Sequence, residues 1–448
     1  MKHANLWVST VLVLTLLFTF TLHAAENSTM IHIQRSLKAM EESTAEHPAH
    51  LRVMFYGQSI VAQAWTEIIQ KKLREKYPTV EFEFFNGAIG GCESPVLRRT
   101  AQADLYPWYP DLLFFNVYGP IEYYEEIIKT VHARTSAEII IWTSHLSEGQ
   151  NPKEMLIERD QRSRDILGVA KRNNCTVIDL NKKWCSYLID KGLEPKVLLA
   201  DNIHLNPAGC ELYANLLWED IARVPGTSGE PNICGTITEI AADDPSVIRG
   251  ANGELTLEFT GNRVTAISDG TAEPGEEAEL FLDGKPLAEH KELWTNTRPS
   301  TGPCWMPAIS CVGIDKLPVK EDWTLSAIDG TQKDGSLIIY KVEGSETGFD
   351  GEGRSDQPFI SNSGRVKLEV EDMRMVWQFA YFKSEVPEHF QVTWSTIPMF
   401  ADPYITAPVG TRTLLLQHCE NGTHKLTIRP KSGNAGIGKW IINAPAVK

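Results

Sequence analysis

A serine and a D-x-x-H pair are the residues of this chain whose chemistry fits together. Ser59 ends the stretch LRVMFYGQS (51–59), and Asp201 and His204 stand in DNIH (201–204). A serine hydroxyl is a weak nucleophile without an adjacent base, and that base needs a group to orient it. In D-x-x-H the carboxylate can hold the imidazole Nδ1–H while Nε2 faces the serine. We therefore predict Ser59 as nucleophile, His204 as general base and then acid, and Asp201 as the orienting carboxylate.

Attack by serine on an acyl carbon also needs N–H donors for the oxyanion that forms. Each such donor is worth about 3 to 4 kcal/mol. The backbone N–H groups of Ser59 and Gly91 are the natural candidates, because Gly90-Gly91 follows the second apolar stretch of the chain. Each feature alone has an ordinary explanation: a turn for G-Q-S and for the glycine pair, and helix capping for Asp201. Their convergence favours catalysis.

Alternating strands and helices must position these residues. Short apolar stretches predict strands at 51–59, 80–85, 111–117, 138–142 and 176–180. Helical spacing appears at 60–77, 124–131 and 154–173, and Asn206 and Pro207 fit the N-cap and first position of a last helix. This series predicts a parallel sheet covered on both faces, with ligands beyond the carboxyl ends of its strands. The residues that the sequence places at this edge, next to a predicted strand or helix, are Ser59, Gly91, Asn116, His145 and the D-x-x-H pair.

Composition and the amino terminus restrict the class of protein. With 42% hydrophobic and 23% charged residues the chain is globular, and a net charge of −15 without a basic stripe excludes nucleic acid as a partner. Lys2 and His3 precede the apolar run 6–22, which is followed by Ala24 and Ala25. This layout predicts a signal peptide at 1–25 and a secreted or periplasmic protein, with an uncleaved membrane anchor as the alternative.

The domain organisation follows from changes in pattern along the chain. A helical brace is predicted at 26–50, an α/β domain at 51–224, a linker in PGTSGEP (225–231) and a β-sandwich at 232–448. Alternating patterns predict strands at 255–259, 264–267, 278–282, 337–342, 366–370, 390–396, 413–416 and 425–428, with turns at 260–262, 283–284 and 421–422.

The sandwich carries aromatic residues and part of the cysteine content. Tryptophans that could stack on sugar rings, most of them expected in the core, are Trp294, Trp305, Trp323, Trp377 and Trp394. Cys304 and Cys311 are the first disulfide pair to test, and no cysteine or histidine spacing matches a zinc site. We expect neither a metal nor an organic cofactor.

The motifs resemble one hydrolase family. GQS lacks the second glycine of a G-x-S-x-G elbow, because Val61 occupies that place, so a lipase-type α/β-hydrolase is disfavoured. GQS, NGAIGG (86–91) and DNIHLNPAG (201–209) together resemble the SGNH (GDSL-like) hydrolase superfamily over residues 50–222. The resemblance implies a flavodoxin-like three-layer domain, a triad of Ser59, Asp201 and His204, and Gly91 as an oxyanion glycine. The β-sandwich weakly resembles the jelly-roll modules of exported carbohydrate-active enzymes.

Two places depart from the family pattern. Where the family has G-x-N-D, this chain has Asn116-Val117-Tyr118-Gly119. The third oxyanion donor is then Asn116 from a shifted position, a backbone N–H near Gly119, or absent, and a purely structural asparagine is the alternative. Gln58 stands where many members have aspartate. Gln58, Tyr118 and His145 are predicted to contact substrate, although a loop histidine such as His145 is more often incidental.

The combined prediction is an exported serine esterase that removes acyl groups, with acetyl expected, from a carbohydrate. One alternative is a lipase or thioesterase on the same fold, which would need an apolar acyl groove. Another is a non-catalytic glycan-binding protein with a weakened oxyanion hole. The expected partner is an acylated carbohydrate, with no nucleic acid and no membrane contact beyond the alternative anchor.

Overall fold

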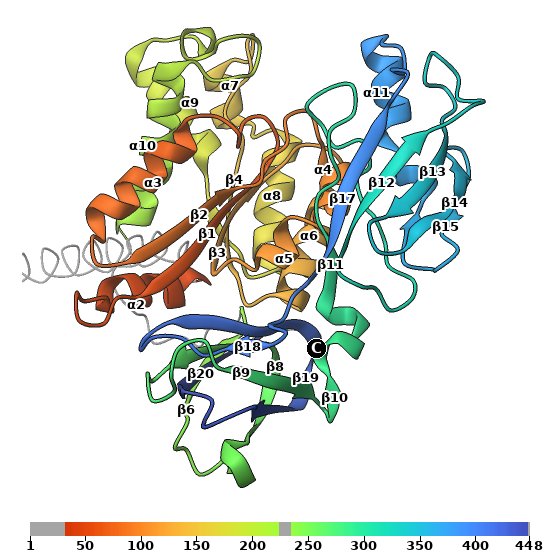
Figure 1. Cartoon of the computed structure of the whole chain (residues 1–448). Coiled ribbons are helices and arrows are strands. Elements are labelled where there is room, and N and C mark those ends of the chain that lie inside the picture. The colour runs from red at the N-terminus through yellow and green to blue at the C-terminus, as the bar shows by residue number, and fades with distance from the viewer. Residues whose placement is uncertain (1–31, 224–233, 447–448) are drawn as a thin grey trace, which may run out of the picture.

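The computed structural model describes residues 32–223 and 234–446. The predicted signal peptide and linker lie outside these residues. Figure 1 shows an α/β part with one antiparallel sheet beneath it and a second antiparallel sheet beside it. Within the described residues no helix is both long and apolar enough to cross a membrane.

The α/β part is built on one parallel sheet with the strand order β2-β1-β3-β4-β5. The strands are β1 (His50–Gly57), β2 (Glu81–Asn86), β3 (Leu112–Asn116), β4 (Glu138–Trp142) and β5 (Thr176–Ile178). Strands β3 and β4 are buried along almost their whole length, which explains their continuous apolar sequences. The order reverses between β1 and β3, and such a reversal opens a ligand crevice at the carboxyl ends of the strands.

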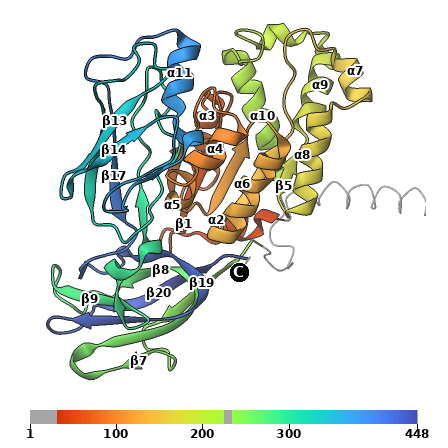
Figure 2. The ribbon, with the colours of Figure 1, turned by 90° about the vertical axis from the view of Figure 1, so that its right-hand side faces the viewer.

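Helices cover both faces of this sheet, as Figures 1 and 2 show. One face packs against α2 (Gln34–Glu42), α3 (Trp65–Lys76), α7 (Pro152–Ile157), α9 (Leu180–Lys191) and α10 (Pro207–Arg223). The other packs against α4 (Ser94–Thr100), α5 (Leu105–Trp108), α6 (Ile121–Arg134) and α8 (Gln161–Arg172). The chain also forms short 3-10 helices: η2 (Pro195–Leu198), η3 (Ala251–Gly253), η4 (Leu287–Glu289), η5 (Lys291–Leu293) and η6 (Val370–Asp372). The predicted three-layer α/β class is confirmed.

Local details of the α/β part differ from the sequence prediction where polar residues cap helices. The single helix expected at 154–173 is two helices, because the side chain of Asp160 accepts the backbone N–H of Ser163 and starts α8. The strand expected at 176–180 ends at Ile178. Asp179 then caps α9, a helix that the sequence pattern did not predict.

The carboxyl-terminal part is built on antiparallel sheets, as predicted, and it encloses two separate apolar cores, to the second of which a single α-helix adds side chains. The eight-stranded sheet comprises β6 (Thr236–Ala241), β7 (Ile248–Arg249), β8 (Leu255–Ser268), β9 (Glu277–Leu282), β10 (Lys285–Pro286), β18 (Tyr404–Ile405), β19 (Arg412–Pro430) and β20 (Ile437–Ala444). The other sheets comprise β11 (Trp294–Asn296), β12 (Glu321–Ala327), β13 (Ile339–Gly344), β14 (Gly348–Arg354) and β17 (Gln391–Pro398), with the pair β15 (Phe359–Ile360) and β16 (Lys367–Leu368). The second core is therefore an insertion between β10 and β18 of the first sheet.

Two predicted turns in this region are wrong. The signals at 260–262 and 421–422 lie inside the long strands β8 and β19, which pair with each other through Gly261 and Gly422. The ladder is irregular between Gln417 and Gly422, so the extra residues form a bulge instead of reversing the chain. A glycine in the sequence is compatible with either a bulge or a turn. The turn at 283–284 does form, with positive φ angles at Asp283 and Gly284.

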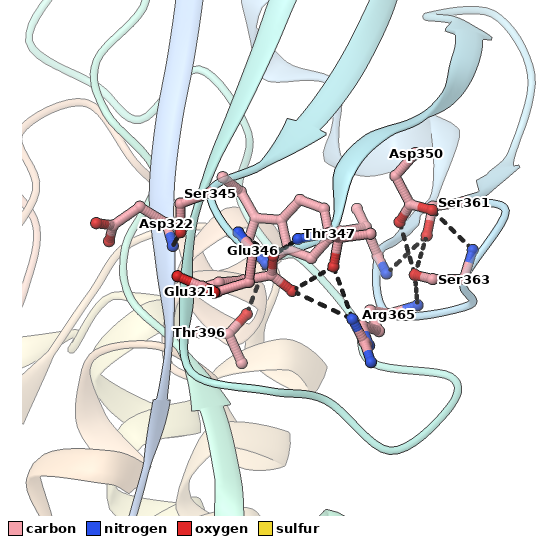
Figure 3. A network of polar contacts seen from close by, with 12 residues as sticks. Glu321, Asp322, Ser345, Glu346, Thr347, Asp350, Ser361, Ser363, Arg365 and Thr396 are labelled. Atoms are coloured by element: carbon pink, nitrogen blue, oxygen red, sulfur yellow. Dashed lines mark hydrogen bonds and ion pairs between the residues drawn. The ribbon is translucent and has the colours of Figure 1, made fainter.

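The inserted sheet has a buried acidic residue that the adjoining turn satisfies. Glu321 accepts hydrogen bonds from the Thr347 backbone N–H (3.0 Å) and hydroxyl (2.9 Å), and Arg365 donates to the same hydroxyl at 2.7 Å (Figure 3). In the same view Asp350 accepts the backbone N–H and the hydroxyl of Ser363. A buried carboxylate is tolerated when its oxygens are hydrogen-bonded in this way. These contacts fix the strand connections of the sheet that also carries α11 (Arg374–Phe382).

Candidate active site

Ser59 lies immediately beyond the carboxyl end of β1, at the point where the strand order reverses. The backbone turns there, with the N–H groups of Val61 and Ala62 donating to the Gln58 carbonyl at 2.8 and 3.1 Å. A Cβ on Gly57 would stand 2.1 Å from the Asn116 carbonyl oxygen and 2.6 Å from a Val61 methyl group. The glycine of G-Q-S is therefore needed for a close backbone approach, and this turn presents Ser59 at the sheet edge.

The structure brings Ser59, His204 and Asp201 together in a linear hydrogen-bonded series. The distance from Ser59 Oγ to His204 Nε2 is 2.8 Å, and that from His204 Nδ1 to Asp201 Oδ2 is also 2.8 Å. The carboxylate beside Nδ1 favours the tautomer with its proton on Nδ1, which leaves Nε2 free to accept the serine proton. This is the geometry that nucleophilic activation of a serine requires.

The D-N-I-H loop (201–204) is held by hydrogen bonds from its own backbone to the Asp201 carboxylate and by the side chain of Gln63. Asp201 Oδ1 accepts the backbone N–H groups of Ile203 (2.9 Å) and His204 (2.8 Å). These two N–H donors, followed by the His204 ring, hold the pKa of Asp201 well below its usual range. Gln63 donates to the Leu205 carbonyl (2.9 Å) and accepts the Leu205 N–H (3.1 Å), which ties the loop to the turn behind Ser59.

The depressed pKa of Asp201 predicts a simple decline on the acid side of the pH profile for any activity of this site. Because Asp201 stays ionised, its own protonation should not add to the loss of activity as the pH falls. We expect log(kcat/KM) to decline with a slope of one on the acid side, measured between about pH 4 and 9. Intrinsic fluorescence over the same range controls for unfolding. A slope of two would show that a second group titrates with the imidazole.

The glycine pair forms a tight turn next to the nucleophile. The Cys92 N–H donates to the Ile89 carbonyl at 3.2 Å, and Gly91 has φ of +78°, as the third residue of a type II turn requires. A Cβ on Gly90 would lie 3.7 Å from the Cβ of Ser59. Within the described residues, neither the Ser59 nor the Gly91 backbone N–H donates to a protein acceptor. Two backbone donors without a protein acceptor thus lie at or beside Ser59.

The stretch Asn116-Val117-Tyr118-Gly119 lies at the end of β3, where its residues hold the local structure. The side-chain amide of Asn116 donates to the Trp142 carbonyl at 3.1 Å and so links the ends of β3 and β4. Gly119 has φ of +102°, and a Cβ there would stand 2.7 Å from the Ser94 hydroxyl. Its carbonyl accepts from Arg162 at 2.7 Å. These contacts match the structural explanation for Asn116, and the third oxyanion donor stays a prediction.

The substrate contacts predicted for single side chains are placed differently. His145 is 4% exposed, and its Nε2 lies 2.7 Å from the Ile203 carbonyl, so it supports the D-N-I-H loop from within. This burial does not fit the predicted substrate contact, and it lowers the pKa of His145 to about 4. Tyr118 is partly buried against the core of the sheet. Gln58 is partly exposed and lines, together with Tyr118, a cavity of about 10 Å³.

Trp305 is a site neighbour whose location the sequence pattern did not reveal. Its indole N–H donates to the Gly90 carbonyl at 2.8 Å across 215 residues of sequence, and the ring remains 61% exposed. Of the other tryptophans that were candidates for sugar stacking, Trp323 and Trp394 are buried, Trp294 is partly buried and Trp377 is exposed. The expectation that most of them pack in a core holds for Trp323 and Trp394 and in part for Trp294, whereas Trp305 and Trp377 are exposed; Trp305 contacts the loop beside Ser59.

Other candidate features lie away from the serine. A cavity of about 920 Å³ between the α/β part and the antiparallel part is lined by Arg99, Arg134, Trp294, Cys311 and Asp372 among others, and by no member of the triad. Cys304 and Cys311 are not joined to each other in the described structure. Among the described residues no group of three or more His, Cys, Asp or Glu side chains is arranged to hold a metal ion.

Comparisons with known proteins give similarity at the level of structure only. No protein-family model matches the chain. No curated protein sequence matches it. Solved structures that match include a two-domain esterase active on acetylated mannans, crystallised with mannopentaose, at 13% identity over 93% of this chain and 95% of that chain, with a TM-score of 0.37.

Two further matches cover a smaller share of this chain. The acetylxylan esterase Axe2 from Geobacillus stearothermophilus matches at 19% identity over 40% of this chain and 97% of that chain, with a TM-score of 0.34. The acetyl xylan esterase AlAXEase matches at 21% identity over 38% of this chain and all (100%) of that chain, with a TM-score of 0.32. Identities and TM-scores this low leave the activity and substrate of the present chain to be argued from its own residues.

Proposed function

We propose that this chain is an exported serine esterase that removes short acyl groups from a carbohydrate. The observation that carries the proposal is the series Ser59 Oγ, His204 Nε2, His204 Nδ1 and Asp201 Oδ2, with 2.8 Å at each hydrogen bond. It stands at the carboxyl edge of a parallel sheet, where ligands of such sheets bind.

The reaction follows from the roles of these atoms. Ser59 Oγ attacks the acyl carbon and transfers its proton to His204 Nε2, while the N–H groups of Ser59 and Gly91 hold the oxyanion. The imidazolium, paired with Asp201, then protonates the departing sugar oxygen. Water, deprotonated by His204, hydrolyses the acyl-serine in the same way and regenerates the hydroxyl.

The surroundings of the nucleophile favour a short acyl group. Gln58 and Ile60 flank Ser59 and line the cavity of about 10 Å³, which has room for about one water-sized group, although Ser59 itself does not line it. A lipase needs an apolar groove for its acyl chain, and this cavity does not supply one. The side chains of Asp201 and His204 are 57% and 37% exposed, so a bulky hydrophilic substrate can approach them from solvent.

Exposed aromatic rings next to the site support a carbohydrate as the acyl carrier. The ring of Trp305 contacts the edge of Phe382 at a centroid distance of 5.6 Å, and Trp377 and Tyr381 stack at 4.9 Å on α11. In both views of the fold α11 lies at the end of the inserted sheet that is level with the carboxyl edge of the parallel sheet (Figures 1 and 2). Such rings pack well against the apolar faces of sugars.

The test is acetate release by the purified protein. We expect hydrolysis of p-nitrophenyl acetate and of at least one acetylated polysaccharide among xylan, pectin, rhamnogalacturonan and xyloglucan, and none with Ser59→Ala beyond the blank. Absence of release above the Ser59→Ala level would refute the esterase proposal. Polysaccharide binding without turnover would then favour the glycan-binding alternative, and equal rates on p-nitrophenyl octanoate would favour a lipase.

A further inference from the structure

The loop that carries the candidate oxyanion glycine is held from outside the α/β part. Two of its carbonyl groups accept hydrogen bonds from the inserted β region: Arg298 Nη2 donates to Gly87 at 2.9 Å, and Trp305 Nε1 donates to Gly90 at 2.8 Å. Met306 is buried in the apolar core of the α/β part, and its methyl group would stand 2.5 Å from a Cβ on Gly91. The segment 298–306 therefore lies along the loop 87–91.

The first of these contacts is itself rigidly held. Arg298 forms two hydrogen bonds with the Asp104 carboxylate, each 2.8 Å long, and Asp104 is buried in the α/β part. A bidentate pair fixes the plane of the guanidinium group as well as its position. Arg298 thus anchors the segment 298–306 to the α/β part close to the glycine loop. Trp305, in the same segment, contacts the Gly90-Gly91 turn.

The turn needs such an anchor because both of its central residues are glycines. A peptide between two glycines can rotate at little steric cost, since neither residue restricts φ to negative values. The C=O and N–H of a trans peptide point in opposite directions. The direction of the Gly90 carbonyl therefore sets the direction of the Gly91 N–H.

We propose that Trp305 is a positioning residue of the active site: by holding the Gly90 carbonyl, its indole N–H keeps the Gly91 N–H directed at the oxyanion. This inference rests on the esterase function proposed above and assigns part of that site to the inserted β region. The exposure of Trp305 supports a functional role, because a ring that is 61% exposed contributes little to a core. Phe382 contacts the ring with an interplanar angle of 71° and limits its rotation.

The test replaces the indole by a ring that lacks the donor. Trp305→Phe should lower kcat for p-nitrophenyl acetate by about 5- to 10-fold and change KM by less than about twofold, because the lost contact acts on the transition state. Trp294→Phe is the matched control: Trp294 also donates its indole N–H to a backbone carbonyl, that of Ala288 at 3.2 Å, but packs, partly buried, against the core of the eight-stranded sheet. This control should leave kcat unchanged.

Hydrogen–deuterium exchange gives a readout that does not depend on turnover. Amides of the peptide spanning 87–92 should exchange several-fold faster in Trp305→Phe than in wild type or Trp294→Phe, with the melting temperature recorded for each. Unchanged exchange and unchanged kcat would overturn the role of Trp305 and leave the esterase intact. A wild-type protein without any Ser59-dependent hydrolysis would instead refute the proposed function, and the exchange data would then decide alone whether Trp305 holds the loop. A lower melting temperature with wild-type kcat and exchange would mean that Trp305 only stabilises the fold.

Discussion

Replacing His204 by alanine should lower kcat/KM for p-nitrophenyl acetate by on the order of 10⁴-fold, because the members of a catalytic triad act as a unit. Without the imidazole, Ser59 Oγ loses the acceptor that stands 2.8 Å away, and no proton can leave it as it attacks. The leaving oxygen also loses its acid. Asp201→Ala should cost less, since the imidazole and the serine remain in contact.

The exposure of this site adds a sharper test of the same prediction. The His204 side chain is 37% exposed, so its removal opens a space that solvent can enter. Added imidazole should therefore restore part of the activity of His204→Ala, and none of that of Ser59→Ala. His47→Ala is the control, because this exposed histidine precedes β1 at the opposite edge of the sheet. A loss below tenfold for His204→Ala would show that His204 is not the base.

The candidate site residues could be predicted to lie together because their signals are local and adjacent to strand ends. Short apolar stretches predicted all five strands of the parallel sheet, and parallel pairing alone brings their carboxyl ends to one edge. Ser59 and Asp201 with His204 could therefore be placed together without knowledge of any contact between them. The order of strands and the exact distances needed the structure.

The features that the sequence did not predict depend on contacts across long stretches of chain. Nothing in the sequence near Trp305 indicates that its indole N–H donates to a carbonyl 215 residues away. A tryptophan in an antiparallel region is more readily interpreted as a core residue. His145 follows a strand at the right edge, but its ring turns inward to the Ile203 carbonyl. The position of a residue at the sheet edge predicts which elements lie near it. It does not predict the direction in which its side chain points.

The turns predicted at 260–262 and 421–422 were wrong for a related reason. Glycine fits a bulge as well as a hairpin, and the choice between them depends on the partner strand. Gly261 and Gly422 face each other in one ladder, so the two signals mark one irregularity of a long strand pair. The interruption of the eight-stranded sheet by the segment that carries Trp305 is equally invisible in the local pattern.

Gly91→Ala tests the oxyanion assignment most directly. At φ of +78° an alanine costs about 1 to 2 kcal/mol, and its Cβ would meet the Met306 methyl group at 2.5 Å. Rotation of the Gly90–Gly91 peptide relieves both problems and turns the N–H away from the oxyanion. We therefore expect kcat to fall by about 10²- to 10³-fold, the usual effect of losing one oxyanion donor, with little change in KM.

Two further variants separate the causes of that loss. Gly284→Ala is the control for the backbone, because Gly284 has φ of +82° and no atom within 4 Å of its ideal Cβ. It should lower the melting temperature by an amount similar to Gly91→Ala and leave kcat unchanged. In the double variant Gly91→Ala with Met306→Ala, recovery of activity would assign the loss to the contact with Met306, and no recovery would assign it to the backbone angle. A kcat within threefold of wild type in Gly91→Ala itself would remove Gly91 from the oxyanion site, and the role proposed for Trp305 would fall with it.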